Sequence, residues 1–187
     1  MTTAVIYLAG PEVFLADAVE LGMAKKALCQ RYGFIGLFPL DAEVQSPDPD
    51  ELPWAISRGN EALIRQADIL IANLTPFRGP SADVGTVYEL GLARGLGKRL
   101  SGYSNDPASF LARSWSQFGP AGQPVPGPEG DIRDRDGLKI EEFGLHDNLM
   151  IEGGIRQSAG TFISHAASEA TRYTDLTAFE RLLQQLA

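Results

Sequence analysis

Short apolar runs alternate along this chain with longer segments in which apolar residues recur every third or fourth position. The runs predict buried strands at residues 4–10, 34–40 and 68–74, and a weaker strand at 98–103. The segments between them predict helices, because a helix turns once in about 3.6 residues and places such positions on one face. The chain therefore alternates between strand and helix.

Four segments carry the helical pattern, and each has its own set of apolar positions. These positions are Leu15, Val19, Met23 and Ala27, then Ile56, Leu63, Ile64 and Ala67, then Val87, Leu90 and Leu92, and finally Leu176, Phe179, Leu183 and Leu186. Gly33 ends the first helix, and Pro53 suits the first turn of the second. Strands and helices alternating at this spacing predict an α/β fold, with a parallel sheet covered by helices on both faces.

The length of 187 residues, 44% of them hydrophobic, indicates a single domain over residues 1–187. Residues 119–137 are rich in glycine, proline and charge, and they predict an exposed loop within that domain. A calcium-binding loop is excluded there. With Gly137 in the sixth position, the first and twelfth fall on Ile132 and Phe143, which are not ligands.

The composition and one short motif argue against nucleic-acid, zinc and dinucleotide binding. A net charge of −8 argues against a nucleic-acid polymer, whose binding depends on neutralising phosphates. One cysteine and two histidines leave too few soft ligands for a zinc site. The Gly-Leu-Gly at 95–97 ends a helix rather than beginning one, which disfavours a dinucleotide site. We expect no metal and no cofactor.

No apolar run approaches the ~18 residues of a membrane span. The N-terminus also lacks a basic region followed by an apolar stretch, which a secretory signal would require. We therefore expect a soluble cytoplasmic protein without a membrane partner.

Glu89 is the residue that the helical pattern does not explain. A surface glutamate usually has a basic residue three or four positions away, but here those positions hold Gly85, Thr86, Leu92 and Ala93. An ordinary solvated side chain is one explanation for Glu89. The other is a functional carboxylate.

The sheet topology indicates where such a carboxylate would act. Parallel α/β sheets bind ligands at the carboxyl ends of their strands. Here those ends are the loop at 10–14, the segment at 41–43 and the stretch at 75–89. Asp83 suits the cap of the helix that carries Glu89. The two acids converge only if Asp83 lies in the loop and Glu89 in the second turn.

Two other polar residues also have a purely structural explanation. Asn60 lies four residues from both Ile56 and Ile64, on the apolar face of its helix, where an asparagine with all its hydrogen bonds satisfied would be stable. Tyr7 lies within the first strand, where a tyrosine is normally a core residue with its hydroxyl bonded.

Three segments resemble the nucleoside 2-deoxyribosyltransferase family: IYLAGPEVF, ADILIANLTPFRGPSADVGTVYELGLARGLGK and FGLHDNLM. The resemblance covers roughly residues 4–103 and 138–155. It implies a flavodoxin-like (Rossmann-like) parallel sheet and transfer of a 2-deoxyribosyl group between purine or pyrimidine bases. Nucleosides and free nucleobases would then be the small-molecule partners.

The same resemblance implies roles for individual residues. Glu89 would be the nucleophile, Tyr7 would hold it, and Asp83 would contact the base. The residues implied to bind substrate are Gly10, Phe14, Glu43, Asn60, Asn148 and Met150. Among these, Phe14 would stack on the base and Glu43 would lie at its edge. Asn148 would reach a neighbouring subunit's site and bind the sugar 5′-hydroxyl, which implies a homo-oligomer of at least two chains.

The chemistry explains why a carboxylate is needed. Breaking an N-glycosidic bond builds positive charge on the sugar, and a carboxylate beside the anomeric carbon stabilises that charge or bonds to it. At position 60, however, many relatives carry an aspartate, and an asparagine cannot serve as an acid. Protonation of the leaving base would then fall to Asp83, Glu43 or water.

Three functions remain open from the sequence. The first is deoxyribosyl transfer between bases. The second is hydrolysis of nucleosides or nucleoside 5′-monophosphates, with water as the acceptor. The third is a nucleotide-sensing module without turnover, because a fold alone does not fix a function.

Overall fold

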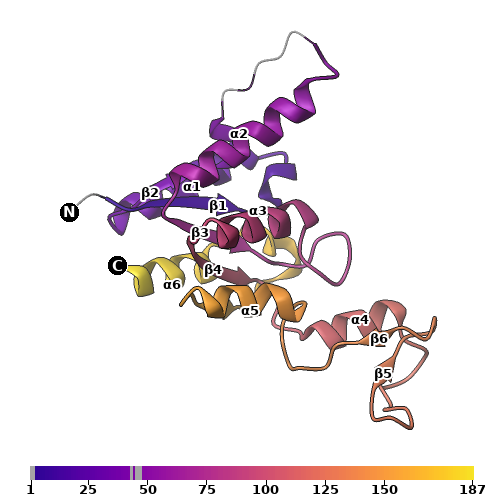
Figure 1. Cartoon of the computed structure of the whole chain (residues 1–187). Helices are drawn as coiled ribbons and strands as arrows, with labels where there is room; N and C mark the ends of the chain where they lie inside the picture. The colour runs from indigo at the N-terminus through magenta and orange to yellow at the C-terminus, as the bar shows by residue number, and fades with distance from the viewer. Residues whose placement is uncertain (1–2, 43, 45–47) are drawn as a thin grey trace.

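The computed structural model describes residues 3–42, 44 and 48–187, and a five-stranded parallel sheet lies at its centre (Figure 1). Its strands are β1 (Val5–Ala9), β2 (Ile35–Leu37), β3 (Ile69–Asn73), β4 (Arg99–Ser104) and β7 (Phe162–Ser164). They are arranged in the order β2-β1-β3-β4-β7. This is the flavodoxin-like order, which reverses between β1 and β3, and the predicted fold class is confirmed.

Helices cover both faces of the sheet. Those on one face are α1 (Ala18–Arg31) and α6 (Thr177–Leu186), and those on the other are α2 (Leu52–Gln66), α3 (Val84–Gly95) and α5 (Leu149–Gln157). Because neighbouring residues of a strand point to opposite faces, Ile6 packs against α1 and α6 while Tyr7 packs against α2, α3 and α5. Each face therefore has its own hydrophobic core.

The first predicted helix is present, but its predicted apolar stripe does not face the sheet. A 3₁₀ turn, η1 (Pro11–Phe14), precedes the helix and delays its start to Ala18. Val19 and Met23 are then more than half exposed, and Leu21 and Leu28 are buried instead. Because the turn shifts the start of the helix, a different set of residues faces the sheet. The periodicity of the sequence alone does not reveal this shift.

The structure also contains elements that the sequence pattern did not predict, namely β7, α5, α4 (Phe110–Phe118) and a hairpin of β5 (Ile132–Arg133) and β6 (Lys139–Ile140). Helix α4, the hairpin and the segment between them, residues 110–140, form an arm that projects away from the sheet in Figure 1. Arg113 anchors its base by donating to the carbonyl oxygens of Pro80, at 2.8 Å, and of His146.

None of the helices in the described ranges is long and apolar enough to cross a lipid bilayer.

A buried ion pair fixes the loop that follows β1. The Lys25 ammonium lies 2.8 Å from Glu12 Oε1, and both side chains are fully buried. Asn73 Nδ2 and the Tyr103 hydroxyl donate to the same oxygen at 3.0 and 3.1 Å. Glu12 Oε2 would lie only 1.8 Å from a Cβ on residue 10, so that position accepts only Gly10. The ion pair therefore ties the loop to α1, and the two hydrogen bonds tie it to β3 and β4.

We expect Lys25→Met to lower the free energy of unfolding by about 3–5 kcal/mol, because it leaves the buried Glu12 carboxylate without a counter-charge. Urea denaturation followed by circular dichroism measures the change. The matched control is Lys26→Met, which removes a surface ion pair with Asp41 and should lose no more than about 1 kcal/mol. Equal losses in the two variants would contradict this account of the loop.

Candidate active site

A cavity of about 320 Å³ opens where the segments after β1 and β2 meet helices α2 and α3. Its lining residues are Gly10, Val13, Phe14, Pro39, Leu40, Ile56, Asn60, Asp83, Gly85, Thr86 and Glu89. The position agrees with the rule that open α/β sheets bind ligands beyond the carboxyl ends of their strands. Five of the residues singled out in the sequence thus line one cavity.

Glu89 is held by two polar side chains from different elements. The Tyr7 hydroxyl on β1 donates to Glu89 Oε1 at 2.6 Å, and Asn60 Nδ2 on α2 approaches the same oxygen at 3.5 Å. Tyr7 is fully buried. Glu89 therefore does not behave as an ordinary solvated glutamate of a surface helix.

Opposing effects act on the charge of Glu89. The net effect raises the pKa of Glu89 from 4.5 to about 7. Burial is the main cause of this rise, and the negative charge of Asp83 adds to it. The hydrogen bonds from Tyr7 and Asn60 favour the ionised form and lower the pKa. Burial, together with the charge of Glu89, raises the pKa of Tyr7, so its hydroxyl keeps the proton that it donates.

Asp83 is the N-cap of α3, as its sequence position suggested. Its Oδ2 accepts hydrogen bonds from the backbone N–H of Thr86 at 2.9 Å and from the Thr86 hydroxyl at 3.0 Å. Because Asp83 lies before the helix and Glu89 in its second turn, both carboxylates reach the same cavity.

One polar atom of the Asn60 side chain has no hydrogen-bond partner among the described residues of the core. Its Oδ1 is buried, and within the part of the chain that the structure describes it accepts no hydrogen bond. An unpaired buried carbonyl costs free energy unless a ligand or water supplies a donor. Asn60 therefore offers an acceptor to whatever occupies the cavity.

Phe14, which lines the cavity, belongs to a cluster of aromatic side chains. Phe14 is 56% exposed, and its ring stacks on Phe77 with 5.3 Å between centroids. Tyr173 meets Phe77 edge-on, and the Arg78 guanidinium lies 4.7 Å from the Phe77 ring centre. The pattern of the sequence did not single out Phe77 or Tyr173. The only signal for Phe77 was its place in a strand-end loop.

Asn148 and Met150, which the sequence also singled out, are not among the residues that line this cavity. Glu43 lies outside the described residues. Asn148 is the N-cap of α5, accepting the Met150 N–H at 3.0 Å, and Met150 is 74% exposed. Neither residue lines the cavity that holds Glu89 in the same chain.

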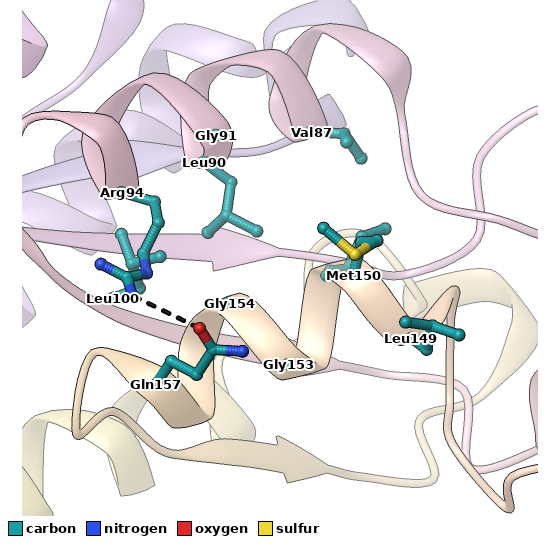
Figure 2. Close-up of a pocket in the computed structure, with 11 residues that line it drawn as sticks. Val87, Leu90, Gly91, Arg94, Leu100, Leu149, Met150, Gly153, Gly154 and Gln157 are labelled. Carbon is teal, nitrogen blue, oxygen red and sulfur yellow. Dashed lines mark hydrogen bonds between the residues drawn. The ribbon is translucent and has the colours of Figure 1, made fainter.

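Met150 instead lines an apolar groove of about 400 Å³ between α3 and α5, shown in Figure 2. Val87 and Leu90 approach from α3, and Leu149 from α5. A hydrogen bond of 3.5 Å from Arg94 to Gln157 crosses one end of the groove.

A sequence model of the family described as nucleoside 2-deoxyribosyltransferase matches residues 6–150. The chain belongs to the nucleoside 2-deoxyribosyltransferase family. An uncharacterized protein of Schizosaccharomyces pombe is 35% identical to it over 165 residues, which cover 83% of this chain and 78% of the yeast protein.

Solved structures agree with this assignment. The 2-desoxiribosyltransferase from Leishmania mexicana is 29% identical to this chain, with a TM-score of 0.65 over 98% of this chain and 99% of the other. A conserved protein from Enterococcus faecalis, 16% identical with a TM-score of 0.52 over the whole of both chains, shares the fold. The family acts on nucleosides and nucleobases, so the chain is an enzyme of the deoxyribosyltransferase or N-glycosidase type.

The raised pKa of Glu89 makes folding stability depend on pH. The folded state binds the Glu89 proton more tightly than the unfolded state, so this stabilising contribution is complete below about pH 4.5 and is lost as the pH rises through about 7. Glu89→Gln, which stays neutral, should exceed the wild type in free energy of unfolding by on the order of 2–3 kcal/mol at about pH 8. The difference should shrink toward zero near pH 4.5.

Urea denaturation at the two pH values measures this difference, with Glu142→Gln on the exposed surface as the control. If Glu89→Gln changed the free energy of unfolding by the same amount at both pH values, the pKa of Glu89 would not be raised in the folded state.

Proposed function

We propose that this protein transfers a 2-deoxyribosyl group from one nucleobase to another through a covalent intermediate on Glu89. The observation that supports this most strongly is the Glu89 carboxylate, which lines the cavity and receives the Tyr7 hydroxyl at 2.6 Å. Both of its hydrogen bonds within the described ranges go to Oε1. Oε2 therefore keeps its lone pairs for the anomeric carbon of the sugar.

In the first half of the reaction, a bond forms between Glu89 Oε2 and C1′ while the C1′–N bond breaks. The bonding electron pair leaves with the base nitrogen, which takes up a proton. In the second half, a nitrogen of the incoming base loses its proton to water and attacks C1′, and Glu89 departs as a carboxylate. Two inversions restore the original configuration, as in retaining glycosidases.

The base is proposed to lie between the Phe14 ring and the N-terminus of α3, which Asp83 caps. Phe14 presents an exposed ring on which a planar base can stack. Asp83 lines the cavity at the N-terminus of α3 and is the proposed contact for the leaving base, and water is the proposed proton source. The unpaired carbonyl of Asn60 accepts an N–H, and Gly10 lines the cavity on the side of β1.

Hydrolysis of nucleosides is the second candidate. The observation that favours it is the exposure of Phe14, which leaves the rim of the cavity accessible to water as an acceptor. Nucleoside 5′-monophosphates are less suitable substrates. Helix N-termini attract phosphates, but the N-terminus of α3 is already occupied by the Asp83 carboxylate, which repels an anion.

The active unit is proposed to be at least a dimer. The groove between α3 and α5 is apolar, and Met150 in its lining is 74% exposed, so a second copy would bury it. Asn148 stands next to this groove and lines no part of its own chain's cavity. In the dimer it would bind the 5′-hydroxyl of a nucleoside in the neighbouring site.

Chromatography of 2′-deoxyinosine or thymidine, incubated with the protein with and without adenine, tests the reaction. We expect 2′-deoxyadenosine only when adenine is present, and a loss of at least about 10³-fold in rate for Glu89→Ala, since the covalent route is removed. Free base released equally well without adenine would make the enzyme a hydrolase. Full activity in Glu89→Ala would exclude the proposed nucleophile.

Mixing two impaired variants tests whether sites are shared between subunits. Asn148→Ala supplies an intact Glu89, and Glu89→Ala supplies an intact Asn148. After exchange of subunits, mixed dimers should contain one complete site, and their activity on a 2′-deoxynucleoside should exceed that of either variant alone.

Met150→Glu, which places a charge in the groove, should give a monomer in sedimentation velocity. The control Met23→Glu, on the exposed face of α1, should leave the assembly unchanged. Failure of complementation together with a fully active monomer would contradict the shared site.

A further inference from the structure

The arm returns to the body of the protein at Glu141, directly after β6. Glu141 Oε1 accepts a hydrogen bond from Asn148 Nδ2 at 2.6 Å, and its Oε2 accepts the backbone N–H of Leu149 at 2.9 Å. On the other side of the same amide, Asn148 Oδ1 accepts the backbone N–H of Met150 at 3.0 Å. The Asn148 side chain is therefore held at both ends.

Glu141 and the backbone N–H of Met150 fix the orientation of the Asn148 amide, with its nitrogen toward Glu141 and its oxygen toward Met150. A carboxylate only accepts hydrogen bonds from donors such as an amide N–H, and a backbone N–H only donates. Turning the Asn148 amide over would therefore break both bonds at once. One N–H and one oxygen lone pair of Asn148 remain available, in a fixed order, which suits a hydroxyl group that both donates and accepts.

Glu141 is itself held in place by the arm. Ile140, its neighbour in β6, pairs with Ile132 of β5, and both isoleucines are almost fully buried. At the base of the arm, the Phe110 N–H donates to the Leu145 carbonyl oxygen at 2.9 Å. The hairpin and its anchor thus give Glu141 a defined position relative to α5.

The segment between Glu141 and α5 is also tied to the active-site loop. Asp147 is 1% exposed, and its Oδ2 accepts the Ala82 N–H at 2.8 Å while its Oδ1 accepts the Ser81 hydroxyl. Ser81 and Ala82 directly precede Asp83, the cap of α3. Asn148 is therefore positioned relative to its own chain's site by Asp147 and oriented by Glu141.

We propose that Glu141 is a positioning residue for nucleoside binding, and that the arm serves to present it. Its carboxylate orients the Asn148 amide to bind the 5′-hydroxyl of a nucleoside in the neighbouring subunit's site. This inference rests on the proposed function and adds Glu141 and the arm to the specificity for an unmodified 5′-hydroxyl.

Comparing a 2′-deoxynucleoside with its 2′,5′-dideoxy analogue, which lacks the 5′-hydroxyl, tests the proposal. Glu141→Ala should lower kcat/KM for the 2′-deoxynucleoside by about tenfold and leave that for the analogue within about twofold, since one oriented hydrogen bond is lost. Glu141→Gln retains one acceptor and should show an intermediate loss. Glu142→Ala, at the exposed neighbouring position, is the control and should match the wild type.

The Asn148 variants separate this inference from the proposed function. If Asn148→Ala loses activity equally on both substrates, the proposed role of Asn148 is wrong. If Asn148→Ala is selective but Glu141→Ala is not, the positioning role of Glu141 is wrong. The double variant should be no worse than Asn148→Ala alone, because both changes remove one interaction.

A second measurement needs no activity. In ¹⁵N-correlated spectra, the Asn148 side-chain amide, assigned by its absence in Asn148→Ala, should give two well-separated proton signals because one proton is bonded to a carboxylate. In Glu141→Ala these signals should move toward each other, to the values of a free amide. Unchanged signals would overturn the proposal even if the enzyme's substrate proved to be different.

Discussion

The hydrogen bond between the Tyr7 hydroxyl and the Glu89 carboxylate is the interaction on which the site depends. It joins strand β1 to helix α3 through two partly or fully buried side chains, at 2.6 Å. Burial disfavours the ionised form of Glu89, which is the form that acts as a nucleophile. The Tyr7 hydroxyl acts against that effect, so the pKa of Glu89 rises only to about 7.

The fold supports this interaction by limiting the movement of the loops around it. The sheet brings the loops after β1 and β3 to the same edge, and the buried Glu12–Lys25 pair fixes the first of them. Asp147 fixes the second, by bonding the residues just before Asp83. A buried ion pair adds little net stability, but it resists displacement because separating its charges is costly. The same loops carry the groups proposed to contact the base.

The sequence was most informative where the pattern is long and regular. The apolar run at 68–74 predicted β3, and the isolated acid Glu89 pointed to the cavity in which it lies. Strand β7 was missed because polar residues and a glycine flank it, so no apolar run marks it, and it forms through pairing with β4. The Glu12–Lys25 pair was missed for a different reason, because polar residues thirteen apart give no local sign that they will be buried together. Contacts of this kind are set by the tertiary fold.

The arrangement at Asn148 shows a further limit of sequence analysis. The motif around it resembles the family, yet its side chain lies outside the cavity of its own chain, and its partner Glu141 directly follows a hairpin that no pattern predicted. The central claim, however, concerns Glu89. Acid quenching during turnover, followed by mass analysis of the proteolytic peptides, tests it most directly. We predict a deoxyribosyl adduct on the peptide that contains Glu89, absent in Glu89→Gln; turnover with no adduct, or an adduct on another residue, would contradict the account.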